Sequence, residues 1–518
     1  MDPALAVAFP LSLREELPRQ GCIPAAEFSR RVDRAGSAAV RPSSSGADSG
    51  RLVSVPLPRE RVPLKATIRT IADRGGHGGR PGSMQPAERP IDKLAARCLS
   101  LLHDLLGGFH PREFAVRLWD GSVLPPGPGL EARFTLVIRG PGGLRALLLS
   151  PTELSLGEAF VYGAIDIEGD LDSVFPLAEY LVRYRPGPGR RLRRLRQILS
   201  LPEDDRLAVS SRPRLSGRLH SVSRDRRAVT FHYDLPGEFY ALWLDRRMVY
   251  SCGFFGSPDD DLDAAQERKL DYICRKLRLR QGERLLDIGC GWGGLLLHAA
   301  ARYGVECVGI TLSRPQAEFA ADRIREAGLS GRCRVEVRDY REMGDTALFD
   351  KIASIGMFEH VGTARLAEYF RLAFRLLRPG GVFLNHGIAR NPSYREAGGP
   401  FFSDYYVFPD GELLPLSTTL RTAEETGFEV RDVESLREHY ELTLRRWAGR
   451  LAASAEKARS MVGETTFRIW RLYLAGAAHS FSVGKNNVYQ ALLSRPDGGR
   501  AGLPLSREDW YRTTPGPC

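Results

Sequence analysis

A short glycine-rich segment carries the clearest chemistry in this sequence. It reads LLDIGCGWGG from Leu285 to Gly294, and an apolar helix is expected from about Leu295. Glycines at this spacing let the backbone approach a bound nucleotide closely, as in the first strand–loop–helix unit of a doubly wound sheet. The segment therefore predicts a site for a nucleotide-like cofactor.

The glycine pattern alone does not identify that cofactor. Gly289, Gly291 and Gly294 fit the dinucleotide fingerprint G-x-G-x-x-G, and a single match of this kind is weak. Asp287 would repel a pyrophosphate but suits a ligand that carries an ammonium and a sulfonium. The next strand ends at Thr311 instead of the acidic residue expected for NAD. These details favour S-adenosylmethionine and a methyltransferase over NAD and a dehydrogenase; a turn that binds nothing is the third interpretation.

The elements that must position this loop alternate between strands and helices from 229 to 496. Strands are expected at Arg284–Ile288, Cys307–Ile310, Arg334–Val337, Lys351–Ser354 and Gly381–Asn385, with final strands near Phe428–Val433 and in the C-terminal segment. This rhythm predicts an α/β fold with a doubly wound, Rossmann-like methyltransferase domain. Residues 497–518 are expected to form a loose tail.

Three segments precede this domain. Residues 1–88 are rich in Arg, Pro, Gly, Ser and Ala, which predicts a disordered or low-complexity extension. Residues 89–184 show one helical pattern followed by alternating strand patterns, which predicts a smaller α+β domain. Residues 185–228 form a basic linker. Its arginine-rich stretch 190–199 has leucines on one face, and it is expected either to lie on anionic lipid or to be a solvated interdomain helix.

Amino-acid composition limits which binding partners and which cellular compartment we expect. The 518 residues carry a formal net charge of +11, which suits nucleic acid or an anionic membrane surface. We find no nucleic-acid fold signature and expect no nucleic-acid partner. No apolar run reaches the length of a membrane span, the first residues make a poor signal peptide, and the eight cysteines lack metal spacing. A cytoplasmic protein without a metal is therefore expected.

Several longer motifs surround the glycine loop. They are YSCGFF from Tyr250, GITLSRPQ from Gly309, RDYR from Arg338, SIGMFEHVG from Ser354, FSDYYVFPDG from Phe402 and HYELTL from His439. This ordered set resembles the cyclopropane-fatty-acyl-phospholipid synthase family, which is related to the mycolic acid cyclopropane synthases. The resemblance covers roughly residues 95 to 495. Its part from Leu156 to Leu171 is similar to the lipid-binding N-terminal domain of the members that act on phospholipids.

The resemblance implies a reaction and a cofactor site. The methyl carbon of S-adenosylmethionine is transferred to a cis double bond of an unsaturated phospholipid acyl chain, and loss of a proton to a bound bicarbonate closes a cyclopropane ring. The implied bicarbonate ligands are Glu359, His386 and Tyr440, with backbone groups near Cys252 and Ile388. The implied cofactor-binding residues are Tyr250, Ser251, Asp287, Gly289, Gly291, Thr311, Leu312, Gln316, Asp339, Tyr340 and Arg341.

The resemblance also implies a peripheral position at the inner membrane surface and is compatible with a homodimer. Ala477 stands where many members have a cysteine, so a covalent role for that thiol is not required here. Three alternatives stay open from the sequence. They are a C-methyltransferase that leaves a methylene- or methyl-branched acyl chain, a small-amine N-methyltransferase, and a lipid-binding protein without activity.

Overall fold

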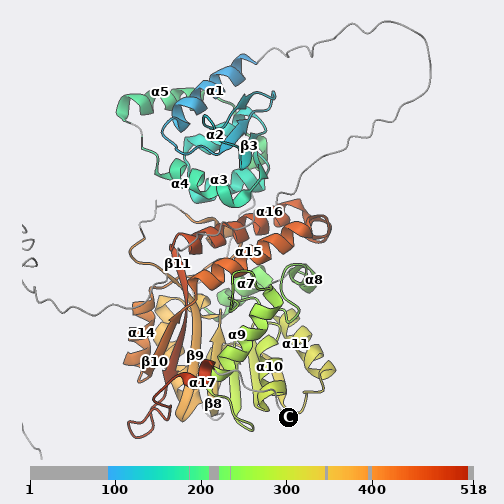
Figure 1. Cartoon of the computed structure of the whole chain (residues 1–518), viewed down its shortest axis with the longest axis vertical. Coiled ribbons are helices and arrows are strands. Elements are labelled where there is room, and N and C mark those ends of the chain that lie inside the picture. Colours follow the sequence, from blue (N-terminus) through green and yellow to red (C-terminus); the bar gives the residue numbers. More distant parts are fainter. Residues whose placement is uncertain are drawn as a thin grey trace, which may run out of the picture. The chain divides into compact units, whose positions relative to one another are not determined.

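The computed structural model describes residues 92–185, 187–208, 221–233, 235–344, 348–394 and 400–511. The predicted extension 1–88 lies outside the described residues. The described chain contains a smaller α+β domain and a larger α/β domain, whose elements are labelled in Figure 1. Both were expected, and the fold class is confirmed.

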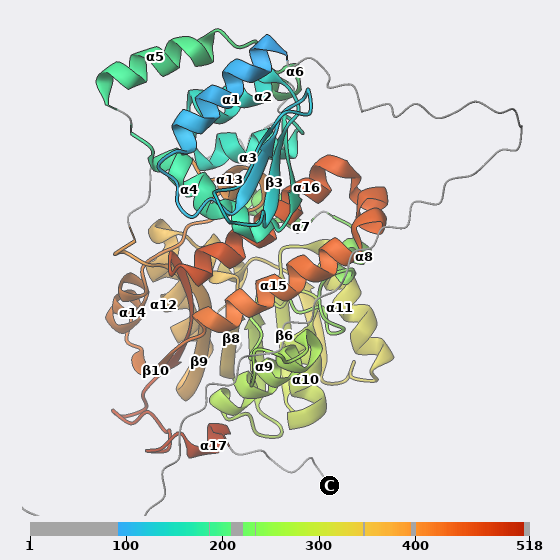
Figure 2. The ribbon, with the colours of Figure 1, turned by 45° about the horizontal axis from the view of Figure 1, so that its top comes forward.

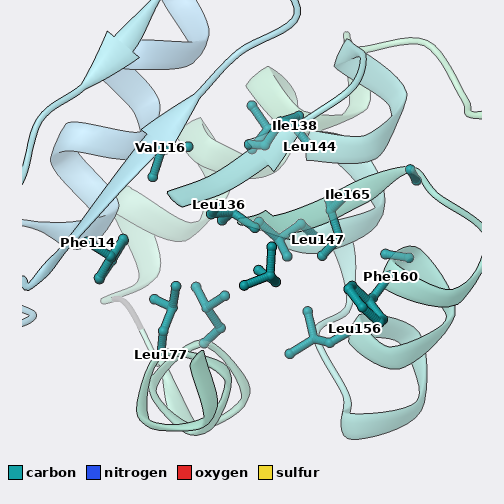
Figure 3. Close-up of a cluster of buried hydrophobic side chains, with 14 of the residues drawn as sticks. Phe114, Val116, Leu136, Ile138, Leu144, Leu147, Leu156, Phe160, Ile165 and Leu177 are labelled. Atoms are coloured by element: carbon teal, nitrogen blue, oxygen red, sulfur yellow. The ribbon is translucent and has the colours of Figure 1, made fainter. Parts of the chain in front are cut away.

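The smaller domain is built on a four-stranded sheet in the order β2-β1-β3-β4. Its strands are β1 (Phe114–Arg117), β2 (Val123–Leu124), β3 (Phe134–Ile138) and β4 (Ile165–Gly169), and its first helices are α1 (Lys93–Leu106), α2 (Pro141–Leu149), α3 (Glu153–Val161) and α4 (Phe175–Arg183). Leu136 of β3, Leu147 of α2 and Phe160 of α3 belong to one buried cluster (Figure 3). Each such apolar side chain contributes about 1.5–3 kcal/mol on burial, so this domain has a core of its own.

The smaller domain extends further along the chain than the sequence predicted. The expected linker contains helices α5 (Pro188–Leu199) and α6 (Asp205–Ala208). Leu201 is buried in the domain's core, and its carbonyl oxygen accepts a hydrogen bond from Arg145 Nη1 at 2.7 Å. The boundary at 184 is therefore wrong, because the packing continues to about residue 208.

The larger domain contains a seven-stranded sheet in the order β10-β11-β9-β8-β5-β6-β7. The strands are β5 (Arg284–Ile288), β6 (Glu306–Thr311), β7 (Cys333–Val337), β8 (Phe349–Ile355), β9 (Leu377–Arg390), β10 (Glu429–Ser435) and β11 (Asn486–Ser494). Strands β5 to β9 pair in parallel, and β11 is antiparallel to both of its neighbours. All the strands predicted for this domain are confirmed, with shifts of a few residues at their ends.

Helices cover both faces of this sheet. They include α9 (Leu262–Leu277), α10 (Gly294–Tyr303) and α11 (Arg314–Glu326) on one face and α12 (Leu366–Leu376) and α14 (Leu416–Glu425) on the other. Consecutive strand residues point to opposite faces, so Leu285 packs with α9 and α10 while Leu286 packs with α12. A strand buried on both faces reads as a continuous apolar run, which is why β5 was recognisable in the sequence.

Two long helices connect the domains. Helices α15 (Arg437–Ala453) and α16 (Ala455–Ser482) lie side by side (Figure 2), and α8 (Gly237–Ala241) packs against α16. Arg468 of α16 donates from Nε to the carbonyl of Phe160 at 2.8 Å and from Nη2 to the carbonyl of Ile165 at 3.2 Å. The same guanidinium pairs with Asp166 at 3.1 Å. The smaller domain is thus held to the larger one by buried, charge-assisted hydrogen bonds.

Most of residues 497–509, in the predicted loose tail 497–518, are exposed, but the described end of this segment packs against the larger domain. Helix α17 (Glu508–Tyr511) places Trp510 against α9 with 2% of its surface exposed. Asp509 forms an ion pair with Arg278, with 2.7 Å between Oδ2 and Nε. In the part of the chain that the structure describes, no helix combines the length and the apolar character needed to cross a bilayer.

A glycine at the domain contact gives the first testable prediction. Gly157 of α3 touches Phe402 at the start of α13 (Phe402–Tyr406), and a Cβ at Gly157 would lie 2.5 Å from the Phe402 ring. We expect Gly157→Ala to lower the free energy of unfolding by about 1–3 kcal/mol through overpacking. Urea unfolding followed by circular dichroism measures the change.

The matched control is Gly449→Ala in α15, where nothing lies within 4 Å of an added Cβ. This variant should raise the free energy of unfolding by up to about 1 kcal/mol, because alanine favours a helix over glycine. Equal effects of the two substitutions would contradict the close domain contact.

Candidate active site

The predicted glycine loop forms one wall of a pocket of about 130 Å³ at the carboxyl ends of β5, β6 and β8. The N–H groups of Gly289 and Cys290 both donate to the carbonyl of Ile310, at 2.9 and 3.0 Å, which ties the loop to β6. Gly289 has φ +84°, and a Cβ there would lie 2.6 Å from Met357 Cβ. A side chain at this position would therefore push the loop out of place.

The structure brings together every residue that the sequence assigned to the cofactor. Those lining the pocket are Tyr250, Ser251, Asp287, Gly289, Gly291, Thr311, Leu312, Gln316, Asp339, Tyr340 and Arg341. They come from four separate segments of the chain: 250–251, 287–291, 311–316 and 339–341. The sequence order alone could not show that these segments meet at one edge of the sheet.

Asp287 is the most unusual acid of this pocket. It is 2% exposed, and its Oδ1 has no hydrogen-bond partner among the residues that the structure describes. Burial raises the pKa of Asp287 to about 7, although the Lys269 ammonium opposes the shift. An acceptor left open inside a pocket fits a ligand that brings a positive group, as the sequence predicted.

Asp339 is already engaged within the protein. Its Oδ1 accepts hydrogen bonds from the backbone N–H and from Nε of Arg341, at 2.9 and 2.8 Å. Arg341 also pairs with Asp225 at 3.0 Å. Asp225 lines the pocket from helix α7 (Val222–Tyr233), which begins inside the predicted linker 185–228 and extends beyond it. Sequence reasoning missed Asp225, because no motif or spacing distinguishes it in a basic segment.

A second, larger cavity of about 480 Å³ lies next to the cofactor pocket. Leu156, Phe160 and Leu177 of the smaller domain line it, together with residues of the larger domain. Tyr250, Gly356 and His360 line both cavities, so the two spaces meet at these residues. His360 was missed as a site residue, although it follows Glu359 directly in the SIGMFEHVG motif.

Three of the predicted bicarbonate-site residues line the larger cavity: Glu359, Ile388 and Tyr440. Glu359 Oε1 accepts a hydrogen bond from the Ile388 N–H at 2.7 Å. Its Oε2 is buried and has no partner in the described part of the chain. Burial raises the pKa of Glu359 to about 7. The cavity thus contains a buried carboxyl group with a raised pKa and one open oxygen.

The other two predicted residues lie behind the cavity wall. His386 is buried on β9, with 3.2 Å between its Nδ1 and Gln490 Nε2, and burial lowers its pKa to about 3. Cys252 is fully buried, its Sγ donates to the carbonyl of Gly253, and burial raises the pKa of its thiol far above the usual range. Neither belongs to the described residues that line either cavity.

Comparison with known proteins places this geometry in context. A family model described as mycolic acid cyclopropane synthetase matches residues 220–491, and a model described as a domain of unknown function matches 101–180. The chain is 41% identical over 403 residues to a probable fatty acid methyltransferase of Pseudomonas putida, which covers 77% of this chain and 96% of the relative.

Two further similarities concern proteins whose names state a product. The cyclopropane-fatty-acyl-phospholipid synthase of Escherichia coli is 35% identical over 276 residues, or 53% of this chain and 69% of that protein. The solved structure of the cyclopropane synthase MmaA2 from Mycobacterium tuberculosis superposes with a TM-score of 0.50 at 34% identity, over 52% of this chain and 97% of that one.

The raised pKa of Glu359 predicts a pH-dependent effect on stability. A glutamate ionises near 4.5 when it is not buried and near 7 here, so its buried carboxylate destabilises the fold increasingly as pH rises between these values. We therefore expect the free energy of unfolding of Glu359→Gln, taken relative to that of the native protein, to be higher at pH 8 than at pH 5 by on the order of 1–3 kcal/mol. Urea unfolding at both pH values measures the difference.

Glu326→Gln, at an exposed position on α11, is the control and should show no such pH-dependent difference. A Glu359→Gln curve that runs parallel to the native one across this pH range would contradict the buried, proton-sharing carboxyl group.

Proposed function

Because this chain belongs to the cyclopropane-fatty-acyl-phospholipid synthase family and is an S-adenosylmethionine-dependent methyltransferase of lipid acyl chains, we propose that it forms cyclopropane rings on unsaturated phospholipids, with bicarbonate as the base. The observation that carries the proposal is the meeting of a cofactor pocket with a larger, mainly apolar cavity at Tyr250, Gly356 and His360. Such a junction brings a methyl donor and a carbon acceptor together away from water.

S-adenosylmethionine, when bound, supplies an electrophilic methyl group. The chain's own residues fit this ligand. Gly289 leaves space for the backbone to approach it, and Asp287 offers an unpartnered acceptor for a positive group. A double bond is a weak nucleophile, so the rate depends on how closely these residues align donor and acceptor.

The walls of the larger cavity favour an acyl chain as the acceptor. Leu156, Phe160 and Leu177 present apolar surface from the smaller domain, and Tyr473 and Ala477 do so from α16. Each buried methylene group of a lipid gains about 0.8 kcal/mol in such surroundings. A small amine without a long apolar chain, the acceptor of the alternative N-methyltransferase, would gain little from these apolar walls.

Glu359 is the residue that we assign to the bicarbonate. Its open Oε2 could accept a hydrogen bond from the hydroxyl of a bound bicarbonate, and that anion would supply the base for the proton lost from the alkylated acyl chain. Tyr440, on the same cavity, is a second group assigned to this anion. The Ile388 N–H donates to Glu359 here, so its part in the site is to hold the carboxyl group in place.

His386 is another residue that we assign to the bicarbonate site, although it lines neither cavity. The imidazole lies beside the Gln490 side chain, with 3.2 Å between His386 Nδ1 and Gln490 Nε2, and burial lowers its pKa to about 3. Because His386 lines neither cavity, we assign it a positioning role through β9, the strand that also carries Ile388, and no direct contact with the anion. Cys252 is assigned a backbone contribution only, because its thiol is buried and protonated.

A second product is favoured by one observation. The Pseudomonas putida relative, which matches nearly its whole length, is named a fatty acid methyltransferase. Loss of a different proton from the same cation gives a methylene-branched chain without a ring. Proton NMR of lipids from an expression host rich in unsaturated chains separates the two products, since cyclopropane protons appear upfield and an exomethylene gives vinyl signals. An unchanged lipid profile would refute both.

Substitution of Glu359 tests the proposed bicarbonate site. We expect Glu359→Gln to bind S-adenosylhomocysteine normally and to lose about 10²–10⁴-fold in turnover, the usual contribution of a positioned acid–base group. Product formation is measured by mass spectrometry of extracted lipids, and cofactor binding by calorimetry. Glu326→Gln is the control on the exposed surface. Native turnover in Glu359→Gln would remove the bicarbonate site from the proposal.

Helix α5 is the part of the chain that we assign to the membrane surface. Leu192, Leu195 and Leu199 are exposed, with 54% and 50% of the surface of the first and last accessible. Arg194 faces inward, and its Nη2 donates to the carbonyl of Asp104 at 2.9 Å. The inward contact fixes the rotation of the helix, so the leucine stripe stays on the outside. Exposed leucines among arginines suit the interface of an anionic bilayer.

Charge neutralisation tests this surface. A triple variant removes three positive charges from α5: Arg191→Gln, Arg193→Gln and Arg196→Gln. We expect it to bind phosphatidylglycerol vesicles more weakly by about 1 kcal/mol per residue, with a larger loss at low salt than at high salt. Vesicle sedimentation measures the binding. The matched control replaces exposed arginines of the larger domain: Arg280, Arg314 and Arg332. Equal losses in both triple variants would show that net charge alone, and not α5, drives the binding.

A further inference from the structure

A buried lysine that the sequence analysis did not select lies on the wall of the cofactor pocket. Lys269 of α9 is 1% exposed, and its Nζ donates to Ser251 Oγ at 2.8 Å. Gln266, three residues earlier, donates from Nε2 to the carbonyl of Ser251 at 2.8 Å. Helix α9 therefore holds Ser251 at two points, the Ser251 carbonyl oxygen and the Ser251 hydroxyl.

The charges around Lys269 are incompletely balanced within the protein. Asp245 interacts with it electrostatically, but the Asp245 carboxylate already accepts hydrogen bonds from the N–H groups of Arg247 and Val249, both at 2.8 Å. Asp287 is the other nearby acid, and its Oδ1 is unpartnered. Burial lowers the pKa of Lys269 to about 8, as expected for an ammonium without a close carboxylate.

An amino-acid group would satisfy both residues at once. An ammonium has three N–H donors, and a single donation from Lys269 to Ser251 leaves two for another acceptor. Asp287 lacks a donor at Oδ1 on the same pocket. A buried charge is costly unless it is paired, so a ligand that carries one carboxylate and one ammonium gains from each end.

We propose that Lys269 is a positioning residue that binds the carboxylate of the methionyl end of S-adenosylmethionine, while Asp287 accepts the ammonium of the same end. This inference rests on the cofactor of the proposed function and is independent of the lipid product and of the base. By fixing the amino-acid end, Lys269 sets where the sulfonium, and with it the methyl group, points toward the larger cavity.

The test compares ligands that differ only at this end. Calorimetry on the full chain measures binding of S-adenosylhomocysteine, of its decarboxylated analogue, and of 5′-methylthioadenosine, which lacks both charged groups. We expect Lys269→Met to weaken S-adenosylhomocysteine about 10- to 100-fold, as for loss of a hydrogen bond to a charged group, and to change binding of the other two less than about threefold.

Lys276→Met is the matched control. Lys276 lies two turns further along α9, is also fully buried, and pairs with Glu434 and Asp432 instead of facing the pocket. This variant should lower the unfolding temperature and leave the ratio of the three ligand affinities unchanged. It separates loss of a buried lysine as such from loss of the carboxylate contact.

The native protein provides a further test that does not depend on the folding of any variant. It should bind S-adenosylhomocysteine at least about 10-fold more tightly than the decarboxylated analogue. Equal affinity for these two, or an equal loss for all three ligands in Lys269→Met, would overturn the assignment of Lys269. Failure to bind any of the three would instead overturn the cofactor of the proposed function.

Discussion

The site depends on keeping three ionisable side chains away from water at the carboxyl edge of one sheet. Asp287, Lys269 and Glu359 are all buried, and their pKa values move toward the neutral form. Isolating a charge in this way costs several kcal/mol unless a partner is supplied. Packing elsewhere in the domain must offset that cost. The two large clusters, one between the sheet and α9–α10 and the other between the sheet and α12, provide it.

The smaller domain completes the enclosure of the larger cavity. Its core residues Leu136 and Leu147 reach the cavity wall as well as packing with one another. Arg468 holds this domain to α16 through the carbonyls of Phe160 and Ile165. A shift of this contact would admit water beside Glu359, where the proposed chemistry needs an apolar surrounding. In the proposed function, the domain contact therefore helps to keep the acyl cavity closed to water.

Much of this architecture was readable in the sequence, and the reasons are physical. Strand β5 is buried on both faces and so appears as an apolar run before a glycine loop. Nine of the eleven predicted cofactor positions lie at or just after the ends of β5, β6 and β7, where parallel strands converge, and Tyr250 and Ser251 reach the same pocket from the loop before α9. The packing of α17 was not predicted, because a single tryptophan at Trp510 leaves no periodic pattern.

Lys269 and Asp225, two pocket residues that the sequence did not predict, have one property in common. Lys269 lies in an amphipathic helix whose charged residues are expected to face solvent, and only the fold turns it inward toward Ser251. Asp225 reaches the pocket from a segment that resembles a linker. In both cases the information is in tertiary contacts between segments far apart in the chain. Local pattern cannot show which charge of a helix is buried.

The smaller domain also relates the proposed membrane surface to the acyl cavity. Helix α5 packs against α2, and Leu147 of α2 lines the cavity. A helix seated in the headgroup region would therefore be separated from the cavity by a single neighbouring helix. An acyl chain leaves a bilayer at a cost that grows with each exposed methylene group, so a short path is favoured over passage through water. This geometry explains why one small domain would carry both the leucine stripe and part of the cavity wall.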